Sequence, residues 1–191
     1  YQGLDRYCWV VLMIAALGWL FDTMDQSLFN LVRVPSLKEL LHPHPENPKL
    51  SPEEAGRLAA DTKLWGGIIT SIFLAGWATG GFIFGILGDR LGRTRTMILT
   101  ILIYAAFTGL SGAVHNVWTY SIVRFIAALG IGGEWAAGSV LVAETWPAAH
   151  RGKAIGIMQS GWAVGYMLAA GLAAVVLPRW GWRPLFVLGI V

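Results

Sequence analysis

The stretch Gly85-Ile-Leu-Gly-Asp89-Arg90-Leu-Gly92-Arg93-Thr-Arg95 decides the fold of this chain. It places one aspartate, three arginines and three glycines in a short segment between two long apolar runs, about residues 64–88 and 96–114. Apolar runs that are separated only by short basic turns are typical of helices that cross a membrane several times. The stretch therefore predicts an all-α polytopic membrane protein.

The composition indicates the same solvent. The 191 residues are 55% hydrophobic and 13% charged, with a mean hydropathy of +0.59, whereas a soluble domain carries about 25% charged residues. Crossing ~30 Å of hydrocarbon takes about 20 apolar residues. A sixth run starts near Trp182, and we expect the chain, which opens at Tyr1, to be a fragment. The five complete runs are 8–32, 64–88, 96–114, 118–145 and 154–177.

Basic residues cluster in two short turns, so the net charge of +3 does not indicate nucleic-acid binding. The positive-inside rule assigns both turns to the cytoplasm. We therefore expect a plasma (inner) membrane protein with a cytoplasmic amino terminus and an extracytoplasmic loop over 33–63. The turn residues are Arg90, Arg93 and Arg95 after the second run, and Arg151 and Lys153 after the fourth.

The predicted loop contains a helix start. Ser51 precedes Pro52, and Glu54 stands at the capping-box position, so a helix should begin here and run toward the second span. His42 and His44 lie upstream, but no third metal ligand is near them in sequence, and we expect a surface loop.

Small residues recur four apart, which places them on one helix face where helices can approach closely. The pairs are Gly76 and Gly80, Gly81 and Gly85, and Gly161 and Gly165. The segment Gly130-Ile-Gly-Gly-Glu134 superficially resembles a dinucleotide-binding loop, but no strand precedes it and it lies within an apolar run.

Charges within the apolar runs are the candidate functional residues, because an ionised group in hydrocarbon costs a few kcal/mol unless it is paired, hydrated or functional. From the helical rise, Asp22 lies about 8 Å from the outer face and Arg124 ~9 Å from it, so we expect the two to pair. Asp25 then supplies a spare carboxylate, which favours proton coupling. Two alternatives stay open: a static Asp22–Arg124 pair, and an Asp25 that is simply hydrated near the outer mouth.

Glu134 is ten residues beyond Arg124, about 15 Å deeper, and we expect it to stay apart from that pair. A faint repeat links it to the first span. Ile14-Ala-Ala-Leu-Gly18 recurs as Ile126-Ala-Ala-Leu-Gly130, and each glycine is followed four residues later by an acid, Asp22 or Glu134. A glutamate in a span needs a cavity, a partner or a proton, so we assign Glu134 to function.

Two further groups are candidates. Gln159, Trp162 and Tyr166 are three and four apart, which gives one face of the fifth span two hydrogen-bonding groups, and we expect Gln159 to point inward. The charged turns are expected to tether helix ends as a conformational latch rather than contact solute. The latch candidates are Gly85, Asp89, Arg90, Gly92, Arg93 and Arg95, with Glu144 and Arg151.

These motifs together resemble one family. Gly85–Arg95 resembles the signature loop between the second and third helices of the major facilitator superfamily. Arg124 with Gly130–Glu134, then Glu144–Pro147 and Arg151-Gly-Lys153, is similar to its fourth helix and following loop. Gly181–Phe186 resembles the beginning of its sixth helix. The resemblance covers the whole chain and implies the amino-terminal six-helix half of a twelve-helix transporter.

Within the superfamily, the Gly-Gly-Glu of the fourth helix is most similar to the proton symporters for sialate and other organic acids. Sugar porters resemble it next; there an aspartate followed by threonine pairs with the helix-four arginine, which falls on Asp22-Thr23 and Arg124. Their helix-five glutamines would fall on Gln159 and Tyr166, of which only the first is glutamine.

The sequence thus predicts a secondary active transporter, and not an enzyme, that carries a carboxylate or acidic sugar with protons and needs no cofactor. Asp22 or Asp25 would carry the proton, with Arg124 as counter-charge or carboxylate anchor. Glu134, Gln159, Trp162 and Tyr166 would line a path toward a missing second half. The alternatives are a sugar porter, an uncoupled facilitator, or a sensor or interaction protein that does not transport.

Overall fold

The computed structural model describes residues 4–41 and 51–189. These residues form helices and no strand, which confirms the predicted all-α class. Five helices are long and apolar enough to cross a membrane: α1 (Arg6–Leu41), α2 (Pro52–Leu91), α3 (Arg93–Ser111), α4 (Val117–Thr145) and α5 (Ala148–Trp180). The short α6 (Arg183–Leu188) begins where the sixth span was expected.

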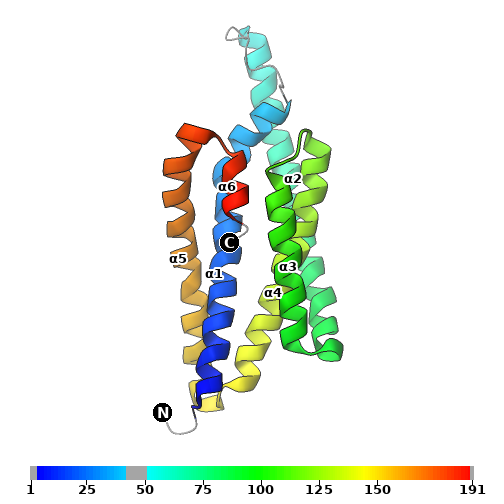
Figure 1. Ribbon diagram of the computed structural model, residues 1–191. Helices are drawn as coiled ribbons and strands as arrows, with labels where there is room; N and C mark the ends of the chain where they lie inside the picture. Colours follow the sequence, from blue (N-terminus) through cyan, green and yellow to red (C-terminus); the bar gives the residue numbers. More distant parts are fainter. Residues whose placement is uncertain (1–3, 42–50, 190–191) are drawn as a thin grey trace.

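The helices stand side by side as one bundle (Figure 1). α1 packs mainly against α5, and α4 packs mainly against α2 and α3. Contacts between α1 and α4 join these two groups through the middle of the bundle. The charged residues of the spans lie on this α1–α4 seam.

The loop expected over 33–63 is largely helical. α1 continues through Pro35 to Leu41, and α2 starts at Pro52, so both helices project beyond the rest of the bundle (Figure 1). The predicted capping box forms: the Ser51 hydroxyl accepts from the Glu54 N–H at 3.2 Å, and the Glu54 carboxylate accepts from the Ser51 N–H at 2.8 Å. Satisfying these free N–H groups lets the helix begin inside the predicted loop. His42 and His44 lie outside the described residues.

Two helix boundaries at the opposite end have clear local causes. Gly92 adopts a φ of 92°, which side chains rarely tolerate, and so ends α2 and begins α3 within a single residue. Asp5 precedes α1, and its carboxylate accepts a 3.0 Å hydrogen bond from the Cys8 N–H. This bond lowers the pKa of the Asp5 carboxyl.

Glycines set the helix spacing, as predicted for two of the three pairs. A Cβ on Gly76 would lie 2.6 Å from the Phe125 carbonyl of α4, and one on Gly80 would overlap the Leu129 carbonyl. Gly161 and Gly165 bring α5 equally close to the backbone of α1. The third prediction is wrong in part, because Gly81 faces α4 whereas a Cβ on Gly85 would meet open space.

The glycines of the 130–134 segment are helical and buried within α4. A Cβ on Gly130 would lie 2.7 Å from the Thr100 carbonyl of α3, and one on Gly132 would overlap the Trp77 carbonyl of α2. These glycines therefore serve helix packing, in agreement with the rejection of a dinucleotide loop.

Candidate functional site

A buried ion pair joins α1 to α4. Arg124 donates from Nη1 to Asp25 Oδ1 at 3.3 Å and from Nη2 to Asp25 Oδ2 at 3.0 Å. Neither side chain is exposed to any extent. Two parallel N–H···O bonds fix the orientation of both groups as well as their distance.

This geometry corrects two predictions from the sequence. Arg124 pairs with Asp25 and not with Asp22, and Asp25 is buried and not hydrated at an outer mouth. The helical rise places the two aspartates only about 4.5 Å apart along the axis. The helical rise alone cannot tell which aspartate faces Arg124, because helix tilt and the reach of the arginine side chain change depth by about as much as this spacing.

Aromatic rings enclose the Arg124 guanidinium. Its central carbon lies 4.5 Å from the ring centre of Phe29, 5.1 Å from Phe73 and 5.4 Å from Phe186, which come from α1, α2 and α6. Ring faces attract a desolvated cation. The rings also exclude water, so Asp25 is the group that neutralises Arg124.

Asp22 and Glu134 form a second buried pair, of two acids. Both are at most 1% exposed, and none of their four carboxyl oxygens has a hydrogen-bond partner among the described residues. A Cβ on Gly18 would overlap Glu134 Oε1, and one on Gly138 would lie 3.5 Å from it. Asp22 follows Gly18 by one helical turn, and the two carboxyl groups are close enough to interact electrostatically.

Glu134 therefore stays out of the Arg124 pair, as expected, but it is not isolated, because Asp22 faces it. The faint sequence repeat between the first and fourth spans could have indicated this contact. Each acid stands four residues after the glycine of its repeat, and these two acids meet across the seam.

Tyr104 of α3 is a further buried polar residue in this part of the bundle. Its side chain is 5% exposed, and it interacts electrostatically with Asp22, Glu134 and Asp25. A Cβ on Gly130 would lie 2.9 Å from the Tyr104 Cβ, so the glycine leaves room for the tyrosine. Tyr104 and the rings around Arg124 were not predicted from the sequence. Among them, only Phe29 could have been identified from the sequence, because it follows Asp25 by one turn on the same face of α1.

Arg93 is the centre of the latch residues. It makes ion pairs with Asp89 of α2 and, at 3.5 Å, with Glu144 of α4, and its Nη1 donates to the Gly85 carbonyl at 3.3 Å. It thus ties the start of α3 to the ends of α2 and α4.

The other charged latch candidates are not tied in this way. Arg90, Arg95 and Arg151 are exposed and make no ion pair within the part of the chain that the structure describes. Gly92 shapes the turn through its backbone and not through a contact.

The fifth-helix candidates lie on the surface of the described bundle. Gln159, Trp162 and Tyr166 are all exposed, and the Trp162 and Tyr166 rings stack with centroids 6.1 Å apart. The expectation that Gln159 points away from lipid stays a prediction, because its side chain lies on the surface of the described helices and not between them. Met158, Gly161 and Gly165 instead form the buried face of α5, because small side chains let it approach α1.

The sequence model of the Major Facilitator Superfamily matches residues 10–191. The chain belongs to this superfamily. Its relatives include the niacin transporter NiaP of Acinetobacter baylyi, which is 31% identical over 186 residues that make up 97% of this chain and 38% of the relative. The sialic acid transporter NanX of Escherichia coli is 38% identical over 122 residues, or 64% of this chain and 30% of NanX.

A solved structure shows the same superfamily fold. It is the crystal structure of a bacterial homologue of the human lysosomal transporter Spinster, in an inward-facing and unoccupied conformation. The match has a TM-score of 0.75 at 20% identity and covers 99% of this chain and 41% of that one. The chain likewise spans about 40% of the length of the curated relatives that it matches.

Proposed function

We propose that the complete protein is a secondary active transporter that carries a small organic carboxylate, an organic acid or an acidic sugar, together with protons by alternating access. It would lie in the plasma (inner) membrane with its amino terminus in the cytoplasm. The relatives support this class of solute, because niacin and sialic acid both carry a carboxylate, and further relatives are named for cis,cis-muconate and benzoate.

The observation that carries the proton coupling is the Asp22–Glu134 pair. An ionised carboxylate only accepts hydrogen bonds, so two adjacent buried carboxylates with no donor in the described part of the chain repel each other and are poorly solvated. One proton shared between them removes a charge and makes an O–H···O bond. The pair would then hold a proton when it is closed to water and release it when the seam opens to the other side.

Asp25 and Arg124 have a different role in this proposal. Because both terminal nitrogens of Arg124 are bound to Asp25, the arginine is a fixed counter-charge beside the proton site and not a free carboxylate anchor. Its positive charge would favour proton release from the neighbouring acids. Any direct contact between Arg124 and solute would first have to break the pair with Asp25.

The remaining candidates belong to the path and to its gating. Gln159, Trp162 and Tyr166 are exposed together on α5 and would face the solute between this half and a second half. The Arg93 contacts would hold one end of the bundle closed until the helices shift.

The test is solute-driven proton movement into proteoliposomes that contain the complete protein. A pH indicator outside the vesicles would be followed while nicotinate, benzoate, cis,cis-muconate, sialic acid or a hexose is added. We expect alkalinisation with an acid, and its loss in Asp22→Asn and Glu134→Gln. Asp61→Asn, an exposed acid of α2, is the matched control and should keep the signal.

Three results would contradict the proposal. Labelled acid that equilibrates without any proton movement would indicate an uncoupled facilitator. A signal that survives in both Asp22→Asn and Glu134→Gln would move the coupling elsewhere. Alkalinisation driven only by the hexose would indicate a sugar porter.

A further inference from the structure

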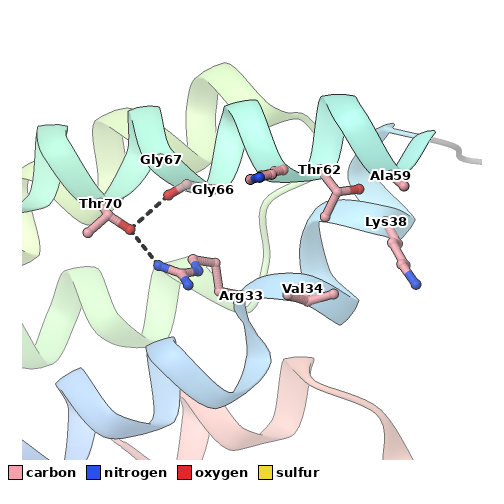
Figure 2. Close-up of a pocket in the computed structure, with 9 residues that line it drawn as sticks. Arg33, Val34, Lys38, Ala59, Thr62, Gly66, Gly67 and Thr70 are labelled. Carbon is pink, nitrogen blue, oxygen red and sulfur yellow. Dashed lines mark hydrogen bonds between the residues drawn. The ribbon is translucent and has the colours of Figure 1, made fainter. Parts of the chain in front are cut away.

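A groove of about 620 Å³ lies between the projecting ends of α1 and α2 (Figure 2). Its size is within the range of small-molecule sites, roughly 300–1,000 Å³. Its cationic residues come from both helices: Arg33 and Lys38 from α1, and Lys63 from α2. The groove is lined, besides these cations, by Val34, Ala59, Thr62, Gly66, Gly67 and Thr70.

Arg33 is held in place across this groove. Its Nη1 donates to the Thr70 hydroxyl at 2.8 Å, and Thr70 in turn donates to the Gly66 carbonyl at 2.8 Å (Figure 2). A Cβ on Gly66 would lie 3.8 Å from Arg33 Cδ and Nε, so the arginine stem rests on the glycine. A guanidinium fixed in this way loses little freedom when it binds an anion.

A second observation points to a ligand. Thr62 lines the groove, is only 6% exposed, and its hydroxyl has no hydrogen-bond partner among the described residues. A buried hydroxyl is normally satisfied, so a missing partner indicates a site for a polar group. Three cations and a free hydroxyl match the oxygens of a carboxylate.

A polar stripe leads from the groove toward the buried acids. Gln26, Asn30 and Arg33 are spaced four and three apart and share one face of α1, where Asn30 is exposed and Gln26 is half-buried. Arg33 is eight residues beyond Asp25, about 12 Å along the helix. Most other exposed residues of α1 are apolar, for example Ile14, Leu17 and Val34.

We propose that this groove captures the carboxylate group of the solute before the solute moves along the polar stripe to the proton site. The inference rests on the proposed function for the identity of the solute. Arg33 and Thr62 bind the carboxylate, and Lys38 and Lys63 raise the local concentration of anions. The aromatic or sugar portion of the solute lies over Gly67, which leaves open space at its surface.

The first experiment measures the anion preference of the groove without relying on transport. Gly67→Cys places a thiol in the groove, where a Cβ meets no atom within 4 Å. The variant is made in the complete protein with all native cysteines replaced, including the buried Cys8. Reaction rates are compared for two methanethiosulfonates, the anionic sulfonatoethyl and the cationic trimethylammonioethyl reagent, with and without benzoate.

We expect the ratio of anionic to cationic reaction rates to fall by about threefold when Arg33→Gln is added. Benzoate should slow the reaction of the thiol introduced by Gly67→Cys. It should no longer slow that reaction when Arg33→Gln is also present. Arg57→Gln is the matched control, because it removes an arginine from the same end of α2 outside the groove. A ratio and a benzoate effect that do not change with Arg33→Gln would overturn the proposal, even if the protein is a proton symporter.

The second experiment measures uptake by the complete protein. We expect Arg33→Gln to raise the KM for acids roughly tenfold with kcat retained, and Arg57→Gln to leave both unchanged. Equal losses in the two variants would overturn the proposal. A third result would also overturn it: wild-type uptake depends on anionic lipid, Arg33→Gln uptake does not, and the KM for acids is the same in both. The groove would then bind a lipid phosphate and not the solute.

Discussion

Arg124 is paired with Asp25 through two hydrogen bonds, although Asp22 lies only three residues away on the same helix. This choice of partner divides the four buried charges of the α1–α4 seam into two units with different chemistry. One unit is a neutral ion pair. The other consists of two acids, Asp22 and Glu134, that have no cationic partner within the described chain.

The two aspartates should therefore respond in opposite ways to the same substitution. Asp25→Asn leaves a buried arginine unpaired, which should destabilise the protein by about 3–5 kcal/mol. Asp22→Asn removes one of two opposed acids and supplies an amide donor to Glu134, so stability should be equal or higher. Thermal unfolding of the complete protein in detergent measures both. Equal destabilisation by the two variants would contradict the assignment of pairs.

Neutralising both members of the ion pair should recover part of the stability lost in Asp25→Asn. The double variant Asp25→Asn with Arg124→Gln removes both charges of this pair, and buried pairs are often replaced at little net cost. We expect a positive coupling energy of at least about 1 kcal/mol in the double-mutant cycle. Strictly additive losses would show that the two side chains do not depend on each other.

Gly18→Ala should displace the Glu134 carboxyl, because the added Cβ would overlap Oε1. We expect loss of coupled uptake and a destabilisation of about 1–3 kcal/mol from overpacking. Combining it with Glu134→Ala should restore stability but not coupling. Gly156→Ala is the control, since its Cβ would meet open space and an alanine favours the helix by up to ~1 kcal/mol.

The Arg93–Glu144 contact should act as one unit in gating. Because Glu144 is half-exposed, its pair contributes little to stability, roughly 0–1 kcal/mol. Its effect should instead appear in the rate of uptake: Arg93→Gln, Glu144→Gln and the double variant should be slowed to a similar extent. Arg151→Gln, an exposed arginine at the same end, should transport normally. Independent, multiplicative effects would argue against a shared latch.

Much of the fold could be predicted because its determinants are local. The apolar runs set the spans, the Ser51 capping box set the start of α2, and glycine spacing identified faces of α2 and α5 that approach other helices closely. The Asp25–Arg124 pairing could not be predicted, because it depends on helix rotation and tilt to within one turn. The Asp22–Glu134 contact was not predicted. The depth of Asp22 was counted from the inner end of the first span and that of Glu134 from the outer end of the fourth, and such a count ignores the length of the side chains.

Infrared difference spectroscopy of the complete protein can detect the single proton that we propose Asp22 and Glu134 share. The spectrum of wild type minus the double variant Asp22→Asn with Glu134→Gln should contain one protonated-carboxyl C=O band at neutral pH, shifted by exchange into heavy water. The same subtraction with Asp61→Asn should contain none. Absence of the band from the wild-type difference spectrum would contradict the shared proton and the coupling mechanism built on it.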